Sequence, residues 1–263
     1  MFRVRYAFFT NTGDVRSDNE DGLLIDGRVV TGDMDCPESG VAGPFETPAL
    51  FIVADGMGGC ACGEVACRVL LEAIRDQARA FAGALGEEDD PVRLGRMVTR
   101  AHRRMNEMAE ETPGMRGMGA AAAGVLVRKA SVLAFNVGDC RVYRCGDENF
   151  RKVTHDHSVV QRLRDEGTIT DEEMRVHPMR NRVTSAVMAG TTPPRLYAAH
   201  LPDVSGRLLV CSDGVWEALP HDELGRCTSL SEAENAASSL ADALRRAGRA
   251  DNVTFILLDV GRD

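Results

Sequence analysis

The stretch Ala49-Leu50-Phe51-Ile52-Val53-Ala54-Asp55-Gly56 is a continuous apolar run that stops at a carboxylate and a glycine. A continuous apolar run of this length predicts a strand. Residues 208–212 repeat the pattern and lead into Asp213-Gly214, and residues 135–137 lead into Gly138-Asp139. A short carboxylate at the end of a rigid strand has little freedom, so we expect each of these aspartates to be held in a fixed direction.

Two more strand-like runs begin directly after acidic residues. Asn19-Glu20-Asp21 precedes residues 22–25, and Asp251 precedes residues 253–260. If these strand ends converge, several carboxylates share one pocket, where two unit charges 4 Å apart repel by roughly 4 kcal/mol at an effective dielectric of 20. Such a cluster persists only if it is protonated or neutralised by cations. Oxygen ligands without a set of histidines favour Mg²⁺ or Mn²⁺ over Zn²⁺.

The alternative is that each Asp-Gly pair is only a turn, because both residues favour turns on local grounds. This alternative explains any single pair, but it does not explain why several apolar runs end in the same way. The sequence therefore predicts a site for hard divalent cations.

The spacing of apolar residues predicts an α+β fold. Strands are expected at residues 4–9, 22–25, 49–54, 121–127, 132–137, 141–144, 208–211 and 253–260. Helices are expected at residues 65–81, from Asp90-Pro91 onward, at residues 159–166, after a capping box at residues 170–173, and from the capping box Ser231-Glu232-Ala233-Glu234 to Gly248. Because strands and helices do not alternate one for one, we expect antiparallel sheets packed together and covered by helices.

The chain shows no clear internal boundary. No linker rich in proline, glycine or serine divides it, so we expect one domain over residues 1–263. Residues 31–48 are the richest loop-like stretch. Residues 154–194 are polar and basic, and we expect them to form a flap-like insertion on the rim of the core.

Composition narrows the class of partners. The 263 residues carry a net charge of −9, which is repelled by nucleic-acid backbones and by anionic lipid. No apolar run approaches the roughly 18 residues that a membrane span needs, and residues 1–6 carry charges where a signal peptide is apolar. The eight cysteines are expected to be mostly reduced thiols. We expect a cytoplasmic protein with no membrane span and no nucleic-acid partner.

Eight motifs lie in order between about residues 6 and 260. They are Gly13-Asp14-Val15-Arg16-Ser17-Asp18-Asn19-Glu20-Asp21, Asp55-Gly56-Met57-Gly58-Gly59 with Gly63-Glu64, Met118-Gly119, Asn136-Val137-Gly138-Asp139-Cys140-Arg141, Thr154-His155-Asp156-His157-Ser158, His177-Pro178-Met179-Arg180-Asn181, Cys211-Ser212-Asp213-Gly214 and Asp251-Asn252-Val253-Thr254. Together they resemble the motifs of the PP2C (PPM) serine/threonine phosphatases, of the bacterial type. The resemblance implies that family's four-layer fold, in which two central antiparallel sheets are flanked by helices on both sides and carry a small flap.

The resemblance also implies a role for each matched residue. Asp55 would bridge two Mn²⁺ or Mg²⁺ ions, with the Gly56 carbonyl on the second ion. The other implied ligands are Asp213 and Asp251 on the first ion, Glu20 and Asp21 on the second, and Asp139 with Asp213 on a weaker third. Arg16 would bind the substrate phosphate, because a planar guanidinium matches two phosphate oxygens.

The implied activity is hydrolysis of phosphoserine and phosphothreonine monoesters in proteins. A hydroxide bridging the two ions would attack phosphorus in line, without a covalent intermediate. The ions and Arg16 would neutralise the charge that develops on the phosphoryl oxygens. By analogy with bacterial relatives, the expected partners are phosphoproteins, including a Hanks-type serine/threonine kinase and its substrates.

The chain departs from the family pattern at a few positions. Cys60 stands where bacterial members usually carry histidine, and Met57 stands where many eukaryotic members carry histidine. Ala120 and Ala121 replace a pair of threonines. None of these residues is an implied metal ligand, so we expect the activity to survive.

The sequence allows other interpretations of the function: two kinds of cysteine-based site, and a PP2C-like protein without activity. Residues 62–68 match the Cys-x5-Arg spacing of cysteine-dependent phosphatases, but Glu64 would repel phosphate and the segment from Val65 onward is expected to be helical. Cys60 and Cys62 are also candidates for part of a zinc site or a redox-sensitive pair. The non-enzymatic alternative is a catalytically weak or inactive PP2C-like regulatory binding module, and retention of the implied metal ligands argues against it.

Overall fold

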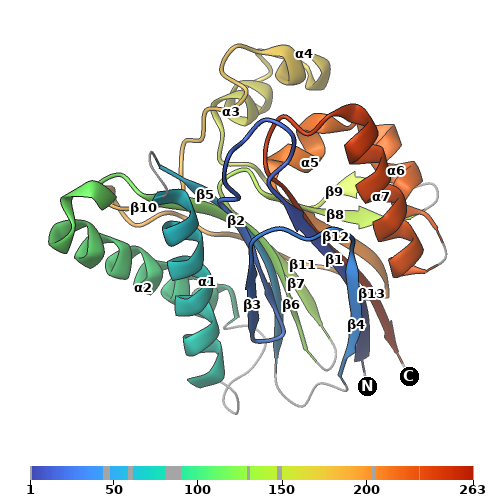
Figure 1. Cartoon of the computed structure of the whole chain (residues 1–263), viewed down its shortest axis with the longest axis horizontal. Coiled ribbons are helices and arrows are strands. Elements are labelled where there is room, and N and C mark those ends of the chain that lie inside the picture. The colour runs from blue at the N-terminus through green and yellow to red at the C-terminus, as the bar shows by residue number, and fades with distance from the viewer. Residues whose placement is uncertain are drawn as a thin grey trace.

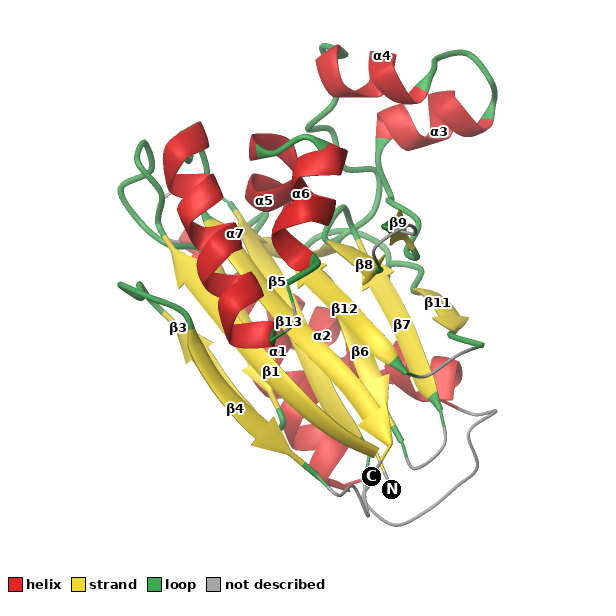
Figure 2. Ribbon diagram, turned by 90° about the vertical axis from the view of Figure 1, so that its right-hand side faces the viewer, coloured by secondary structure: helices red, strands yellow, loops and turns green. Residues whose placement is uncertain are grey.

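The computed structural model describes residues 2–43, 48–58, 62–80, 90–128, 131–146, 150–202, 205–230 and 232–262. Two sheets lie face to face in the middle of the molecule, and helices cover both outer sides (Figure 1 and Figure 2). Every pairing between the strands that the structure describes is antiparallel. The predicted α+β sandwich is therefore confirmed.

The first sheet contains β1 (Phe2–Asn11), β4 (Glu38–Ala42), β8 (Arg141–Cys145), β9 (Arg151–Lys152), β12 (Gly206–Cys211) and β13 (Val253–Arg262). Its strand order is β4-β1-β13-β12-β8-β9. The second sheet contains β2 (Asp21–Ile25), β3 (Arg28–Thr31), β5 (Ala49–Met57), β6 (Gly119–Val127), β7 (Val132–Val137), β10 (Val187–Met188) and β11 (Tyr197–His200). Its order is β11-β7-β6-β5-β2-β3, and β10 pairs with β6 outside this path.

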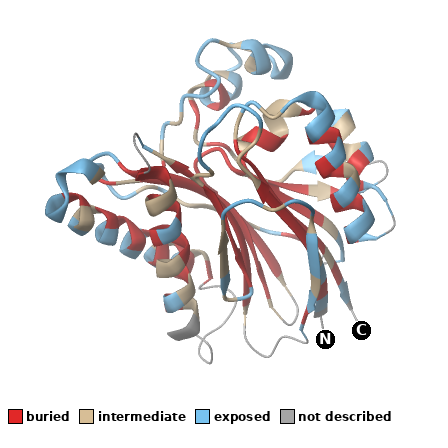
Figure 3. Ribbon diagram, viewed as in Figure 1, coloured by how far each residue is buried: buried red, intermediate tan, exposed pale blue. Residues whose placement is uncertain are grey.

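The central strands are apolar on both faces because each face is covered. Successive side chains of a strand point to opposite faces. In β5, Phe51 and Val53 pack in the core between the two sheets, whereas Ile52 and Ala54 pack in the core under the helices on the outer side. Figure 3 shows this as buried residues along the inner strands of both sheets. The continuous apolar run of β5 is thus explained by two cores rather than one.

Two groups of helices close the sandwich. The second sheet is covered by α1 (Cys62–Ala80) and α2 (Asp90–Glu111), which share its outer core. The first sheet is covered by α5 (Asp213–Ala218), α6 (His221–Thr228) and α7 (Ala233–Ala247). A 3₁₀ turn, η2 (Pro113–Met115), follows α2. Among the described residues, none of the helices combines the length and the apolar character that crossing a membrane requires.

The predicted flap stands above one end of the sandwich. It contains α3 (Val159–Asp165) and α4 (Asp171–Val176), which are largely exposed (Figure 1 and Figure 3). The capping box at the start of α4 is confirmed, since Thr170 and Glu173 exchange hydrogen bonds between side chain and backbone. The boundary near residue 194 needs correction, because β10 lies within the predicted insertion and pairs with β6 of the core sheet.

Several elements differ from the sequence-based expectations. β4 lies inside residues 31–48, which were expected to be a loop, and α5 and α6 were not predicted. β5 continues past Asp55 to Met57, so Asp55 lies within a strand and not at its end. Two expected features, the Ser231 side of the last capping box and the final turn of the first helix at Phe81, fall outside the described residues. Glu232, the next residue of that predicted capping box, is the N-cap of α7, and its side chain makes no capping hydrogen bond.

Candidate active site

The predicted acidic residues come from both sheets and meet at the flap end of the sandwich. Asp21 and Asp55 are directly opposite each other on β2 and β5 of the second sheet. Asp213 begins α5 with one residue between it and β12, and Asp251 lies just before β13; both strands belong to the first sheet. Asp139 lies in the connection from β7 to β8, which crosses between the two sheets. The two-sheet architecture thus brings together side chains that are far apart in the sequence.

The charges of these groups act on one another. Burial raises the pKa of Asp55, and the charges of Asp213, Asp21, Asp139 and Asp251 raise it further. Burial, with the charge of Asp251 beside it, also raises the pKa of Asp213, although a hydrogen bond with Asp55 opposes the shift. Like charges collected in a buried place favour proton or cation binding. The cluster therefore has the electrostatic character that a cation site needs.

Two more carboxylates share this environment. Burial raises the pKa of Asp21 to about 7, in spite of the hydrogen bond that the Ser212 hydroxyl donates to its Oδ2 at 2.8 Å. Burial, reinforced by the charge of Asp213, raises the pKa of Asp139 to about 8. Burial likewise raises the pKa of Glu20.

Close backbone packing places Glu20 beside the strand that carries Asp55. The Gly56 amide donates to the Glu20 carbonyl at 3.1 Å. A Cβ on Gly56 would lie 2.1 Å from the Gly63 carbonyl oxygen, and a Cβ on Gly63 would lie 2.5 Å from Glu20 Oε1. Only glycine fits at position 56, where backbone atoms lie too close for a Cβ, and a side chain at position 63 would displace the Glu20 carboxylate.

Asn252 holds the loop that carries the N-terminal motif. Its amide nitrogen donates to the carbonyls of Thr12 and Asp18, both at 2.9 Å, and its Oδ1 accepts from the Glu20 amide at 2.9 Å. Sequence reasoning quoted Asn252 within a motif but gave it no role. These contacts join residues about 240 positions apart, so no local pattern in the sequence indicates them.

Arg16 lies at the edge of the cluster. Its guanidinium donates to Asp251 Oδ2 at 2.6 Å, and about half of the side chain is exposed. This hydrogen bond, together with the charge of Asp251, raises the pKa of Arg16. The arginine is therefore within reach of both the acidic cluster and solvent, as a phosphate-binding group must be.

The carboxylates do not form a preformed ligand set in their present rotamers. Over the described part of the chain, no group of three histidine, cysteine or acidic side chains is arranged to hold a metal ion. Arg16 engages Oδ2 of Asp251 and Ser212 engages Oδ2 of Asp21. A cation at the cluster would compete with Arg16 for Asp251 and with Ser212 for Asp21. The donor set of oxygens, the burial and the mutual repulsion all fit a hard divalent ion.

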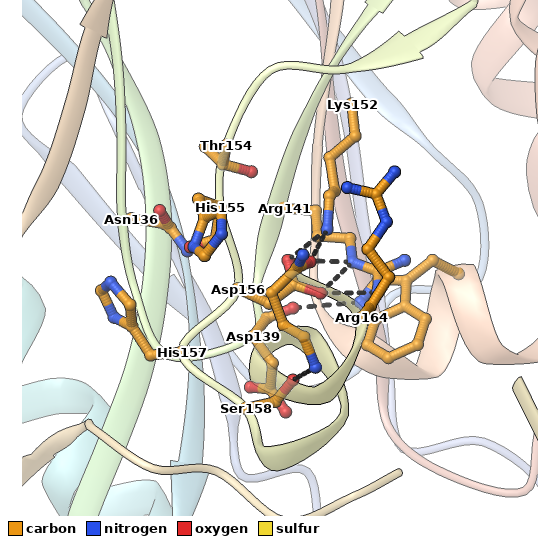
Figure 4. Close-up of polar contacts among 12 residues, drawn as sticks. Asn136, Asp139, Arg141, Lys152, Thr154, His155, Asp156, His157, Ser158 and Arg164 are labelled. Carbon is orange, nitrogen blue, oxygen red and sulfur yellow. Dashed lines mark hydrogen bonds and ion pairs between the residues drawn. The ribbon is translucent and has the colours of Figure 1, made fainter. Parts of the chain in front are cut away.

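A buried ion-pair network lies behind Asp139 (Figure 4). The Asp156 carboxylate accepts from Arg141 at 2.6 and 3.0 Å and pairs with the Lys152 ammonium at 3.0 Å. The Arg141 guanidinium stacks 3.4 Å above the centre of the Trp216 ring, and Trp216 Nε1 donates to the Asp139 carbonyl at 3.1 Å. The network thus connects the base of the flap with the backbone of a candidate metal ligand. These contacts give Asp156 a structural role.

Glu217 is a candidate active-site residue that the sequence analysis missed. It lies one turn after Asp213 on α5, and its buried Oε1 has no hydrogen-bond partner among the described residues. Burial and the charge of Asp213 raise its pKa to about 7. An i, i+4 relation to Asp213 indicates this position once α5 is recognised as a helix.

The positions that depart from the family pattern are accommodated or lie outside the described residues. Ala121 pairs with Asp55 and is fully buried, and its Cβ lies 2.4 Å from where a Cβ on Gly138 would be. Ala120 is also fully buried, opposite Gly56. Cys60 is outside the described residues, so the proposed Cys60–Cys62 zinc or redox pair stays a prediction.

The structure argues against a cysteine-dependent phosphatase. Cys62 begins α1, is buried, and its thiol donates to the Gly114 carbonyl at 3.1 Å. Arg68 lies one turn after Glu64 on the same helix and pairs with it. A phosphate-binding loop of free backbone amides cannot form within a helix, so the Cys-x5-Arg spacing is incidental.

The fold and the acidic cluster define a phosphatase-like α+β sandwich, and comparison with known proteins identifies its family. The family model for protein phosphatase 2C matches residues 45–252. The chain belongs to this family, as the motifs predicted.

Individual relatives agree over almost the whole chain. PstP, a serine/threonine protein phosphatase of Mycobacterium tuberculosis, is 29% identical over 259 residues, which are 98% of this chain and 45% of that protein. This chain therefore spans less than half the length of that relative. The structure of the serine/threonine phosphatase Stp1 from Staphylococcus aureus matches with a TM-score of 0.82 and 28% identity, covering 98% of this chain and 95% of that one. The catalytic domain of PstP in complex with two manganese ions matches with a TM-score of 0.80 and 27% identity, covering 100% of both chains.

Proposed function

We propose that this protein hydrolyses phosphoserine and phosphothreonine in other proteins and that it requires divalent metal ions. The observation that carries the proposal is the meeting of the buried Asp21 and Asp139 with the half-buried Asp55 and Asp213, with an arginine at the edge of the cluster. A cluster of like charges is costly for the fold. Its presence at the end of the sandwich is accounted for by cation binding.

We assign each residue of the cluster a role in metal binding. Asp55 would contact two Mn²⁺ or Mg²⁺ ions, with Asp213 and Asp251 on one side and Glu20, Asp21 and the Gly56 carbonyl on the other. Asp139 would hold a weaker third ion together with Asp213. When bound, the ions supply an acidified water and neutralise charge on the phosphoryl oxygens. This assignment follows the family resemblance, and the proximity of the carboxylates supports it.

Arg16 would hold the substrate phosphate once its guanidinium leaves Asp251. Its half-exposed position allows an incoming phosphate monoester to compete for the same donor. The developing negative charge strengthens this contact in the transition state, which is what accelerates a reaction. No nucleophilic side chain of the chain is needed, so no covalent intermediate is proposed.

We further propose phosphoproteins as the partners, including a Hanks-type kinase and its substrates, by analogy with bacterial relatives. A cytoplasmic location is proposed because the core cysteines Cys67, Cys140 and Cys211 are buried free thiols. The pairing of β1 with β13, which joins the two ends of the sequence, supports a single domain over residues 1–263.

Replacement of Arg16 by alanine should lower kcat/KM for a phosphothreonine peptide about a hundredfold, because one charged contact to the reacting group is lost. Arg16→Lys should recover only part of this, since an ammonium cannot make two parallel hydrogen bonds to phosphate. Steady-state kinetics of the purified variants measure the effect. Equal activity of wild type and Arg16→Ala would remove Arg16 from the phosphate site.

Phosphate release from a phosphothreonine peptide and from p-nitrophenyl phosphate tests the proposed activity. We expect release in Mn²⁺ or Mg²⁺ and none after treatment with EDTA. Alkylation of thiols with iodoacetamide should leave the rate unchanged, which separates this chemistry from that of a cysteine nucleophile. An inactive chain that still binds phosphopeptides would instead support the alternative, a regulatory binding module.

A further inference from the structure

A groove adjoins the candidate active site. It has a volume of about 360 Å³ and is lined by Met57, by the segment from Val183 to Met188 and by the turn from Thr191 to Arg195. Met57 comes directly after Asp55-Gly56 on β5. The Ser185 carbonyl on the groove wall lies 3.8 Å from where a Cβ on Gly138 would be, next to Asp139. The groove therefore begins where a phosphorylated residue would be bound.

The walls of the groove are held by the core. β10 forms one wall and pairs with β6 of the second sheet. The Thr184 amide donates to the His157 carbonyl at 2.7 Å, which attaches the same wall to the base of the flap. The Gly190 amide donates to Asn106 Oδ1 at 2.7 Å, which anchors the following turn to α2. A groove that is fixed before binding loses little entropy when it takes up an extended peptide.

The lining has a distinct chemistry. It combines apolar side chains, including Met57 and Met188, with hydroxyl side chains such as those of Thr184 and Thr192. The rigid pair Pro193-Pro194 and one cation, Arg195, complete the lining. The Arg195 side chain is exposed, and within the described ranges it makes no ion pair. In a chain of net charge −9, an arginine without an acidic partner beside the active site is a specific electrostatic feature.

We propose that this groove binds the substrate polypeptide next to its phosphorylated residue, and that Arg195 selects an acidic side chain there. The inference rests on the protein phosphatase activity proposed above and adds a sequence preference to it. The small hydroxyl and proline side chains leave room for an extended backbone. The guanidinium supplies the charge complementarity, and the partner is a phosphoprotein segment with aspartate or glutamate beside the phosphoresidue.

A set of phosphothreonine peptides tests the preference. Each peptide carries a single glutamate at a different position flanking the phosphothreonine. We expect one position at which glutamate raises kcat/KM, mainly through KM. Arg195→Glu should lower kcat/KM for that peptide about fivefold and favour the corresponding lysine peptide, as expected for one partly exposed ion pair. Arg151→Glu, an exposed arginine on β9, is the matched control and should change nothing. Hydrolysis of p-nitrophenyl phosphate, which is too small to reach the groove, should be unaffected by Arg195→Glu.

A binding measurement separates this inference from the activity. Fluorescence anisotropy of the same labelled peptides on Asp55→Asn protein reports binding without turnover, and Arg195→Glu should weaken the glutamate peptide there as well. Thr192→Trp, which fills the groove, should weaken all the peptides and spare p-nitrophenyl phosphate. If the glutamate preference is absent, or survives Arg195→Glu in both assays, the groove proposal is wrong even if the enzyme is active. If wild type releases no phosphate but peptide binding depends on Arg195, the groove stands and the proposed activity does not.

Discussion

Asp55→Asn should lose at least about a thousandfold in the rate of phosphate release while keeping its fold. Asp55 is the carboxylate on which the charges of four others converge, and in the proposed assignment it contacts both ions. Asparagine has nearly the same shape but carries no charge, so electrostatic stabilisation of the reacting group is lost together with the metal ligand. Release of phosphate from p-nitrophenyl phosphate in excess Mn²⁺ measures the loss.

The same substitution should leave the chelated protein equally stable or more stable. Burial and neighbouring charges raise the pKa of Asp55, so at neutral pH its ionised form opposes folding in the absence of cations. Removal of that charge relieves the repulsion. Thermal unfolding in EDTA should show an unchanged or higher Tm for Asp55→Asn, and added Mn²⁺ should raise the Tm of wild type more than that of the variant. A variant that unfolds in EDTA at a clearly lower temperature would show that Asp55 has a structural role instead.

Asp156→Asn should be among the most destabilising single changes in the protein, at about 3–5 kcal/mol. Asp156 is 2% exposed and accepts charge-assisted hydrogen bonds from Arg141 and Lys152. An amide in its place leaves both partly buried cations without this counter-charge. For a chain of this length, the loss corresponds to a fall in Tm of roughly 10 °C. Urea unfolding at pH 7 measures it.

The pH dependence of that loss has a definite sign. Burial alone would raise the pKa of Asp156, but the charges of Arg141 and Lys152 more than offset this and lower it from 3.8. A carboxylate with a lowered pKa stabilises the fold above its unfolded-state pKa and loses this contribution as the pH falls. The difference between wild type and Asp156→Asn should therefore shrink below about pH 4.

An exposed aspartate provides the matched control for this prediction. Asp242 pairs with Arg245 on the surface of α7, and both side chains are exposed. Asp242→Asn should change the free energy of unfolding by less than about 1 kcal/mol. If Asp156→Asn were as mild as this control, the buried network would not be what attaches the flap base to the core.

Much of the fold was predictable because its strands are long and apolar. Residues 49–54 are all apolar because both faces of this strand are covered, and so continuous an apolar run predicts a strand from the sequence alone. β4 was missed because it is a short, mostly exposed edge strand with no alternation of apolar and polar residues. α5 was missed because its six residues are too few to show a helical period.

The acidic residues of the site were also predictable, but their supports were not. Asp55 and Asp213 stand out because each interrupts an apolar run. Trp216 acts through one hydrogen bond to a distant backbone group and Asn252 acts through three, and such contacts leave no periodic pattern in the sequence. The local sequence pattern thus identifies the acidic residues of the site, whereas tertiary contacts determine how those residues are positioned.

Diffraction at the manganese absorption edge from crystals grown with Mn²⁺ locates the ions relative to these side chains. We predict two anomalous peaks flanking the Asp55 carboxylate, one against Asp213 and Asp251 and the other against Glu20 and Asp21, with Asp251 turned away from Arg16. If manganese instead binds elsewhere, or if no peak lies within coordinating distance of Asp55, the converging carboxylates are not a metal site and the proposed chemistry is wrong.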